Sequence, residues 1–207
     1  FVVAGHSKRG HAAWLAAAVD ARVAGIIAIA IDVLNSRAQI AHHRLVAGEI
    51  SRSSRIFSEV IEAEDSPRGR CLMTLIDPFT YRSALAEPKL IVLGTNDDYT
   101  PVDALNLYWD DLPGDRSVLY LPNTSHAGAY THPSVNASAF AFVRAVAAGE
   151  SLPEIAVSVD AREGAVVGVG DAAVGDGPRQ ARGAGVDRRA RRRGRRPPSP
   201  SRGSRAR

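Results

Sequence analysis

The chain has 207 residues, of which 45% are hydrophobic and 23% are charged, and its formal net charge is +4. This composition is typical of a globular protein. The single cysteine, Cys71, excludes an internal disulfide framework and a structural zinc site built on cysteines. No run of about 18 apolar residues occurs, so no membrane span is predicted.

The positive charge is concentrated at one end of the chain. Residues 160–207 contain 13 arginines against 5 acidic residues, a net charge of +8. Residues 1–159 carry 13 basic and 17 acidic residues, a net charge of −4. The basic character therefore belongs to the C-terminal segment and says nothing about the function of the remainder.

Strand-like and helix-like segments alternate along residues 1–150. The pattern predicts, in order, a buried strand at 1–4, an alanine-rich helix at 9–19, an apolar strand at 23–31 and helical or loop material at 36–86. A third strand at 89–93, a helix at 102–111, a fourth strand at 117–121 and an amphipathic helix at 133–148 follow. This alternation predicts an α/β domain over residues 1–150, doubly wound around a mostly parallel sheet.

The C-terminal segment has a different composition. Residues 151–160 are predicted to be a linker, and residues 161–207 lack aromatic side chains and are predicted to form a disordered, arginine-rich tail. A nucleic-acid-binding arm or a localisation signal is one interpretation. The other interpretation is an inert segment, of the kind that a frameshift in a GC-rich gene would produce. The chain has 24 arginines and only two lysines, as a GC-rich gene would encode, and this favours the second interpretation. Nucleic acid is therefore not an expected partner.

Ser7 is the candidate nucleophile. It lies in Gly5-His6-Ser7-Lys8-Arg9-Gly10, between the first predicted strand and the first predicted helix. A serine on such a sharp turn presents its Oγ at the helix N-terminus, and the following N–H, that of Lys8, can point at a substrate oxyanion. The motif departs from G-x-S-x-G because Arg9 occupies the second glycine position.

A nucleophilic serine needs a histidine base and an acid that orients the histidine. When the serine follows a strand of a parallel α/β sheet in this way, the acid comes next along the chain and the histidine comes last. Asp97 comes directly after the strand at 89–93 and is the favoured acid, with Asp32, which ends the strand at 23–31, as the alternative. Asp97 could also simply cap the helix predicted after it. His126 follows the strand at 117–121 among small residues and is the candidate base.

Several segments resemble the PhoPQ-activated pathogenicity-related proteins, a mainly bacterial family with an α/β-hydrolase fold. The resemblance covers roughly residues 1–153, and its most specific parts are the SKRG and YWDDLPG segments. It implies that Ser7, Asp97 and His126 fill the triad positions and that the full-length parent is exported. Family members extend well upstream of the serine. The chain is therefore expected to be a C-terminal part of the hydrolase domain that lacks upstream strands and the second oxyanion donor.

These observations predict a serine hydrolase that cleaves an ester or amide through an acyl-enzyme, although a fragment could be inactive. The alternative is a non-catalytic secreted or signalling protein on a hydrolase scaffold, because a fold does not fix a function. No cofactor and no metal are predicted. The expected partner is a small-molecule or peptide substrate whose identity the sequence does not give.

Overall fold

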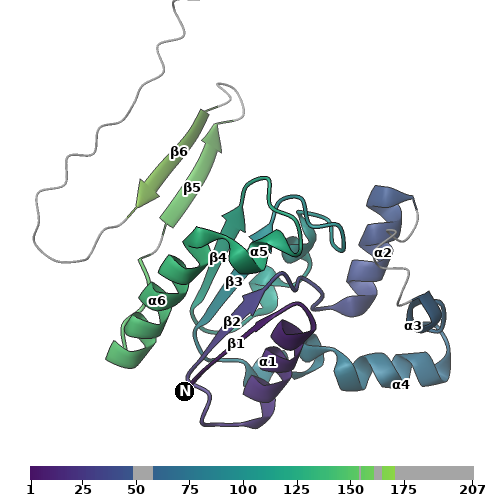
Figure 1. The fold of residues 1–207 in the computed structure, drawn as a ribbon. Coiled ribbons are helices and arrows are strands. Elements are labelled where there is room, and N and C mark those ends of the chain that lie inside the picture. Colours follow the sequence, from purple (N-terminus) through teal and green to yellow (C-terminus); the bar gives the residue numbers. More distant parts are fainter. Residues whose placement is uncertain (49–57, 154, 161–164, 171–207) are drawn as a thin grey trace, which may run out of the picture. The chain divides into compact units, whose positions relative to one another are not determined.

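The structure is a computed structural model that describes residues 1–48, 58–153, 155–160 and 165–170 (Figure 1). Its main sheet has four parallel strands in the order β1-β2-β3-β4, namely Val2–His6, Gly25–Ile29, Lys89–Gly94 and Arg116–Leu121. Parallel neighbours require crossover connections. The sequence supplies these as helices, and the predicted α/β architecture with a parallel sheet is confirmed.

Alternate side chains of β2 enter two separate cores. Ile26 and Ala28 pack with Trp14 of α1 (Lys8–Val19). Ile27 and Ile29 belong to the other core, which includes Phe142 of α6 (Pro133–Ala148). Because successive strand residues point to opposite faces, α1 and α6 cover opposite faces of the sheet (Figure 1). This explains why β2 is apolar at every position.

The connection from β2 to β3 contains α2 (Ser36–Ala47), α3 (Ser58–Glu62), α4 (Pro67–Ile76) and the 3-10 helix η2 (Pro78–Ala84). Asp77, between α4 and η2, links the first and last helices of this connection through hydrogen bonds. Its carboxylate accepts hydrogen bonds from the backbone N–H groups of Ser36 at 2.6 Å and Phe79 at 2.9 Å. One buried carboxylate thus caps both α2 and η2.

The helix predicted at 102–111 is not a continuous α-helix. Two short 3-10 helices take its place, η3 (Ala104–Leu107) and η4 (Trp109–Asp111), and Tyr108 between them has a φ of −150°. Leu105 and Tyr108 are both buried. Both side chains belong to the core cluster that includes Trp14 of α1. The predicted helix is thus replaced by two short 3-10 helices that meet at the buried Tyr108.

Two strands lie within the segments predicted to be a linker and a tail. β5 (Ile155–Asp160) and β6 (Ala165–Gly170) form an antiparallel two-stranded sheet. Alternating valines in IAVSVD and AVVGVG favour this conformation locally, although the segment has few large apolar residues. The predicted disorder of residues 171–207 lies outside the described residues. Within the described residues, no helix combines the length and apolar character that crossing a bilayer requires.

Candidate active site

Ser7 occupies a strained turn between β1 and α1. Its backbone has φ 55° and ψ −128°, a region that residues other than glycine rarely adopt. Its N–H donates to the carbonyl of Ile29 at 2.8 Å, which ties the turn to the end of β2. The sheet therefore holds Ser7 in a conformation that brings its Oγ to the N-terminus of α1.

Two glycines make this turn sterically possible. A Cβ on Gly5 would lie 2.3 Å from the backbone carbonyl carbon of Arg9, and a Cβ on Gly10 would lie 2.8 Å from the carbonyl oxygen of Gly5. Strand and helix are therefore in backbone contact through Gly5 and Gly10. Arg9 is exposed. The departure from G-x-S-x-G thus leaves the turn intact, because the Arg9 side chain is exposed and it is a Cβ at position 10 that would meet the carbonyl of Gly5.

Asp97 lies in the turn that follows β3. Its Oδ1 accepts from the N–H of Tyr99 at 2.8 Å, and its Oδ2 lies 2.9 Å from Nδ1 of His126. The Asp97 side chain is only 6% exposed. The backbone bond fixes the orientation of the carboxylate and leaves the other oxygen for the imidazole.

His126 lies between Asp97 and Ser7. Its Nε2 is 2.8 Å from the Oγ of Ser7, while its Nδ1 faces Asp97. A carboxylate can only accept, so Nδ1 carries the hydrogen, and the unprotonated Nε2 can then accept from the serine hydroxyl. The structure therefore brings together the three side chains that the sequence singled out, in the order acid, base, nucleophile.

The loop that carries His126 is closely packed on the end of β3. A Cβ on Gly94 would lie 2.3 Å from the carbonyl oxygen of Thr124, so only glycine permits this contact. The same carbonyl accepts from the N–H of Asn96 at 3.0 Å, and the N–H of Asn123 donates to the hydroxyl of Thr95 at 2.8 Å. These contacts hold the loops carrying Asp97 and His126 together.

Asp32, the alternative acid, is not brought to His126. It is 2% exposed, and its Oδ1 has no hydrogen-bond partner. Burial raises the pKa of Asp32 to about 7, and the nearby charges of Asp97 and Asp103 act in the same direction. A carboxyl group with this pKa is partly neutral near pH 7, which suits it poorly to stabilising an imidazolium.

Lys8 is the first residue of α1 and is exposed. The first N–H groups of a helix have no partner within the helix. The amide of Lys8 is thus a candidate oxyanion donor beside Ser7, with the positive end of the helix dipole behind it. The described residues contain no group of three or more His, Cys, Asp or Glu side chains that could hold a metal ion.

Two rings beside His126, and a third beside one of them, were not anticipated from the sequence. Tyr99 lies 4.4 Å from the His126 ring and His6 lies 5.1 Å from it, measured between ring centroids. The ring of Tyr130, 65% exposed, is 5.6 Å from that of His6. His6 is next to Ser7, and Tyr99 is two residues after Asp97. This closeness along the chain is the only feature of the sequence that indicates a place in the site for them.

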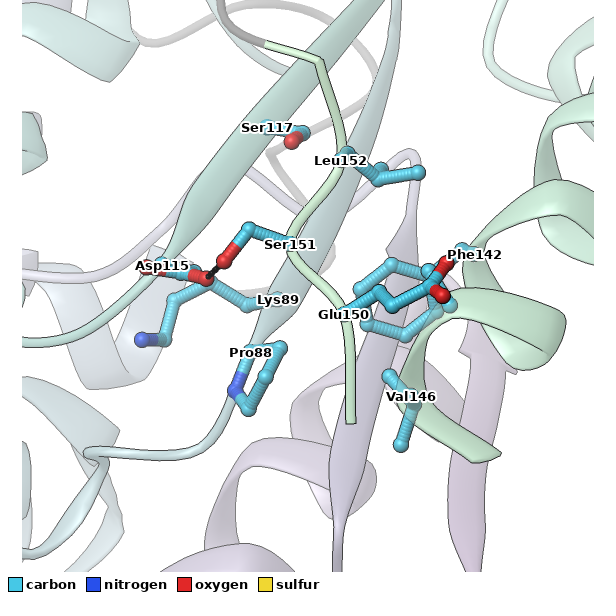
Figure 2. A pocket seen from close by; sticks show the side chains of 10 residues that line it. Pro88, Lys89, Asp115, Ser117, Phe142, Val146, Glu150, Ser151 and Leu152 are labelled. Carbon is cyan, nitrogen blue, oxygen red and sulfur yellow. Dashed lines mark hydrogen bonds between the residues drawn. The ribbon is translucent and has the colours of Figure 1, made fainter. Parts of the chain in front are cut away.

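A small hollow at the other end of the strands is no alternative site (Figure 2). It lies beside Lys89, the first residue of β3, and Ser151, whose hydroxyl contacts Asp115 Oδ2 at 2.5 Å. Its volume is about 10 Å³, which is room for about one water molecule. Ser7, Asp97 and His126 lie at the carboxyl ends of their strands, where ligands of open α/β sheets bind.

Comparisons with solved structures agree with this architecture. The chain is similar to acetyl xylan esterase 1 from Thermoanaerobacterium sp. JW/SL YS485 (TM-score 0.51, 14% identity) and to the acetyl xylan esterase from Paenibacillus sp. R4 (TM-score 0.52, 18% identity). Each match covers 69% of this chain and 44% of the other. At these identities the similarity establishes the fold alone.

Sequence comparisons give one relative and one family match. The autocrine proliferation repressor protein A of Dictyostelium discoideum is 27% identical over 175 residues, which are 81% of this chain and 35% of that protein. This chain thus spans about a third of the length of that relative. The PhoPQ-activated pathogenicity-related protein family matches residues 1–174, past residue 153, where the resemblance was expected to end. With its parallel sheet and this match over most of its length, the chain belongs to the PhoPQ-activated pathogenicity-related protein family.

Proposed function

We propose that the protein is a serine hydrolase that cleaves a carboxylic ester or amide through an acyl-enzyme, with Ser7 as nucleophile, His126 as general base and Asp97 as the orienting acid. The observation that carries the proposal is the continuous pair of hydrogen bonds from Asp97 Oδ2 through His126 to Ser7 Oγ, 2.9 and 2.8 Å long. A serine hydroxyl is a weak nucleophile, and this arrangement is what activates it.

In the first half-reaction, Ser7 Oγ attacks the carbonyl carbon while its proton moves to His126 Nε2. Asp97 stabilises the resulting imidazolium through the Nδ1–H bond. The negative charge that develops on the carbonyl oxygen is stabilised by the N–H of Lys8. The tetrahedral intermediate then collapses, and the leaving group takes the proton from His126.

In the second half-reaction, water replaces the alcohol or amine. His126 Nε2 removes a proton from the water as it attacks the acyl carbon, and then returns a proton to Ser7 Oγ when the acid product leaves. The residues that do this are on the turns after β1, β3 and β4. Each is anchored by the sheet, so the three groups are preorganised before a substrate binds.

A fluorophosphonate probe tests the proposal directly, since it phosphonylates activated serines without requiring knowledge of the substrate. The full-length protein is expected to be labelled at Ser7, as located by peptide mass spectrometry. The variants S7A and H126A are expected to lose labelling, and S134A, which removes an exposed hydroxyl in α6, to retain it. Absence of labelling on folded protein, or labelling that persists in S7A, would overturn the proposal.

A second candidate is a non-catalytic secreted or signalling role on the hydrolase scaffold. It is supported by the name of the Dictyostelium relative, an autocrine proliferation repressor, at 27% identity. The two candidates differ in one measurable respect. If purified protein alters cell proliferation, the hydrolase proposal expects S7A to abolish the effect, whereas a binding role expects S7A to act like the original protein.

A further inference from the structure

His6, the last residue of β1, makes a contact across the candidate active site. Its Nε2 lies 2.8 Å from the backbone carbonyl oxygen of His126, 120 residues along the chain. A carbonyl oxygen only accepts, so Nε2 of His6 carries a hydrogen and donates it. The strand that presents Ser7 is thereby bonded directly to the backbone of the residue that contacts Ser7.

The imidazole of His6 also packs beside two rings. Its centroid is 5.1 Å from that of His126 and 5.6 Å from that of Tyr130, with tilted ring planes. Tyr130 belongs to α5 (Gly128–Thr131), the element that follows His126. His6 therefore contacts both the residue that would act as base and the short helix that continues its loop.

This contact is placed where the His126 loop needs support. Asn123, three residues before His126, has a φ of 52°. The N–H of Asn123 and the carbonyl of Thr124 form hydrogen bonds with residues just after β3. They fix the loop relative to Asp97. His6 belongs instead to β1, so its bond fixes the loop relative to Ser7. A bond to the carbonyl restrains the backbone of His126, and the position of its imidazole depends on where that backbone is held.

We propose that His6 is a positioning residue that holds His126 in reach of Ser7 through its bond to the His126 carbonyl. This inference rests on the proposed function, and it adds a residue that neither takes a proton from Ser7 nor stabilises the oxyanion. Misplacement of a catalytic group by about 1 Å can cost roughly 100-fold in rate. Loss of the His6 donor should therefore reduce turnover without altering substrate affinity.

Two variants separate the donor from the ring. H6F keeps an aromatic ring of similar shape and removes the N–H, whereas H6Q places an amide N–H near the position of Nε2. With a p-nitrophenyl ester, H6F is expected to lower kcat roughly 10- to 100-fold, the range typical of groups that orient the ligands of a metal site. KM should stay within about twofold, and H6Q should recover most of the loss. If H6F does not fold, H6N replaces it in the comparison with H6Q. The shorter asparagine amide cannot reach the His126 carbonyl, so H6N should lower kcat as H6F would.

A spectroscopic measurement tests the inference apart from catalysis. The His126 Nδ1–H bonded to Asp97 is expected to give a low-field proton resonance, identified by its loss in D97N and its retention in S7A. H6F should broaden or shift this resonance, and H6Q should preserve it. If the starting protein is not labelled by fluorophosphonate but shows this pattern, the hydrolase proposal fails while the positioning role stands. An unchanged resonance in both H6F and H6N, or an unchanged kcat, overturns the positioning role.

Discussion

Gly5 and Arg9 approach so closely that a Cβ on residue 5 would lie 2.3 Å from the backbone carbonyl carbon of Arg9. Neither backbone can yield, because Gly5 is in β1 and Arg9 is in the first turn of α1. The contact makes residue 5 a sensitive test of how the Ser7 turn is built.

G5A is expected to destabilise the protein by about 3 kcal/mol or more, because overpacking against backbone forces strand and helix apart. G149A is the matched control: Gly149 has a φ of +69°, and a Cβ there would meet no atom within 4 Å. Its cost should be about 1–2 kcal/mol, from the left-handed conformation alone. Urea unfolding measures both, and equal costs would contradict the steric explanation.

The strain at Ser7 leads to a second prediction. Because glycine adopts positive φ without a steric penalty, S7G should be more stable than S7A by about 1 kcal/mol. Both variants lack the hydroxyl, so the comparison removes any contribution of the Ser7–His126 bond. Guanidinium unfolding midpoints measure the difference. An S7A protein as stable as S7G would mean that the turn relaxes when Oγ is absent.

The two candidate acids should respond differently to amidation. D97N leaves the shape of the site unchanged but favours the wrong tautomer of His126, and kcat should fall by about 10⁴. D32N should change kcat by no more than a few-fold, because Asp32 is buried beside Tyr108 and makes no bond to His126. Ester turnover measures both variants. A large loss in D32N with a small loss in D97N would reverse the assignment.

Asp32 should also make stability depend on pH. Burial raises its pKa to about 7, above the unfolded value near 3.8, so the folded state binds more protons between these values. The stabilising contribution is complete below about pH 4 and is lost as pH rises to about 7. The loss is on the order of 4 kcal/mol.

D32N removes this titration and is the control for the pH experiment. The difference in unfolding free energy between D32N and the starting protein should therefore move in favour of D32N as pH rises from about 4 to about 8. Urea unfolding at several pH values measures the difference. A difference that stays constant over this range would show that Asp32 does not titrate in the folded state with a raised pKa.

The sheet and the candidate triad could be predicted from sequence because both depend on local signals that agree with the tertiary packing. The run GIIAI is apolar throughout, as a strand covered on both faces must be, and Asp97 and His126 each come just after a predicted strand. Parallel topology then brings the ends of these strands to one edge. The order of elements alone left Asp32 as an alternative acid, because it too ends a strand, and the contact of Asp97 with His126 separates the two.

The features that were missed depend on contacts distant in sequence. The bond from His6 joins residues 120 positions apart, and no local pattern encodes it. The break between the two 3-10 helices lies at the buried Tyr108, and residues 102–112 contain no glycine or proline that would mark a break in the sequence. The strands at 155–160 and 165–170 were obscured by a composition poor in aromatic residues.

Ser7, Asp97 and His126 follow β1, β3 and β4, and β2 lies between the first two of these strands. A strand advances roughly 3.3 Å per residue. A slip of one residue between any two neighbours would therefore move one of the three groups by more than the 2.8–2.9 Å length of the bonds that join them. Under the proposed function, reactivity at Ser7 is thus a readout of strand alignment. Misregistered or partly assembled sheets would be chemically silent even with every side chain present, so probe labelling would count correctly folded molecules.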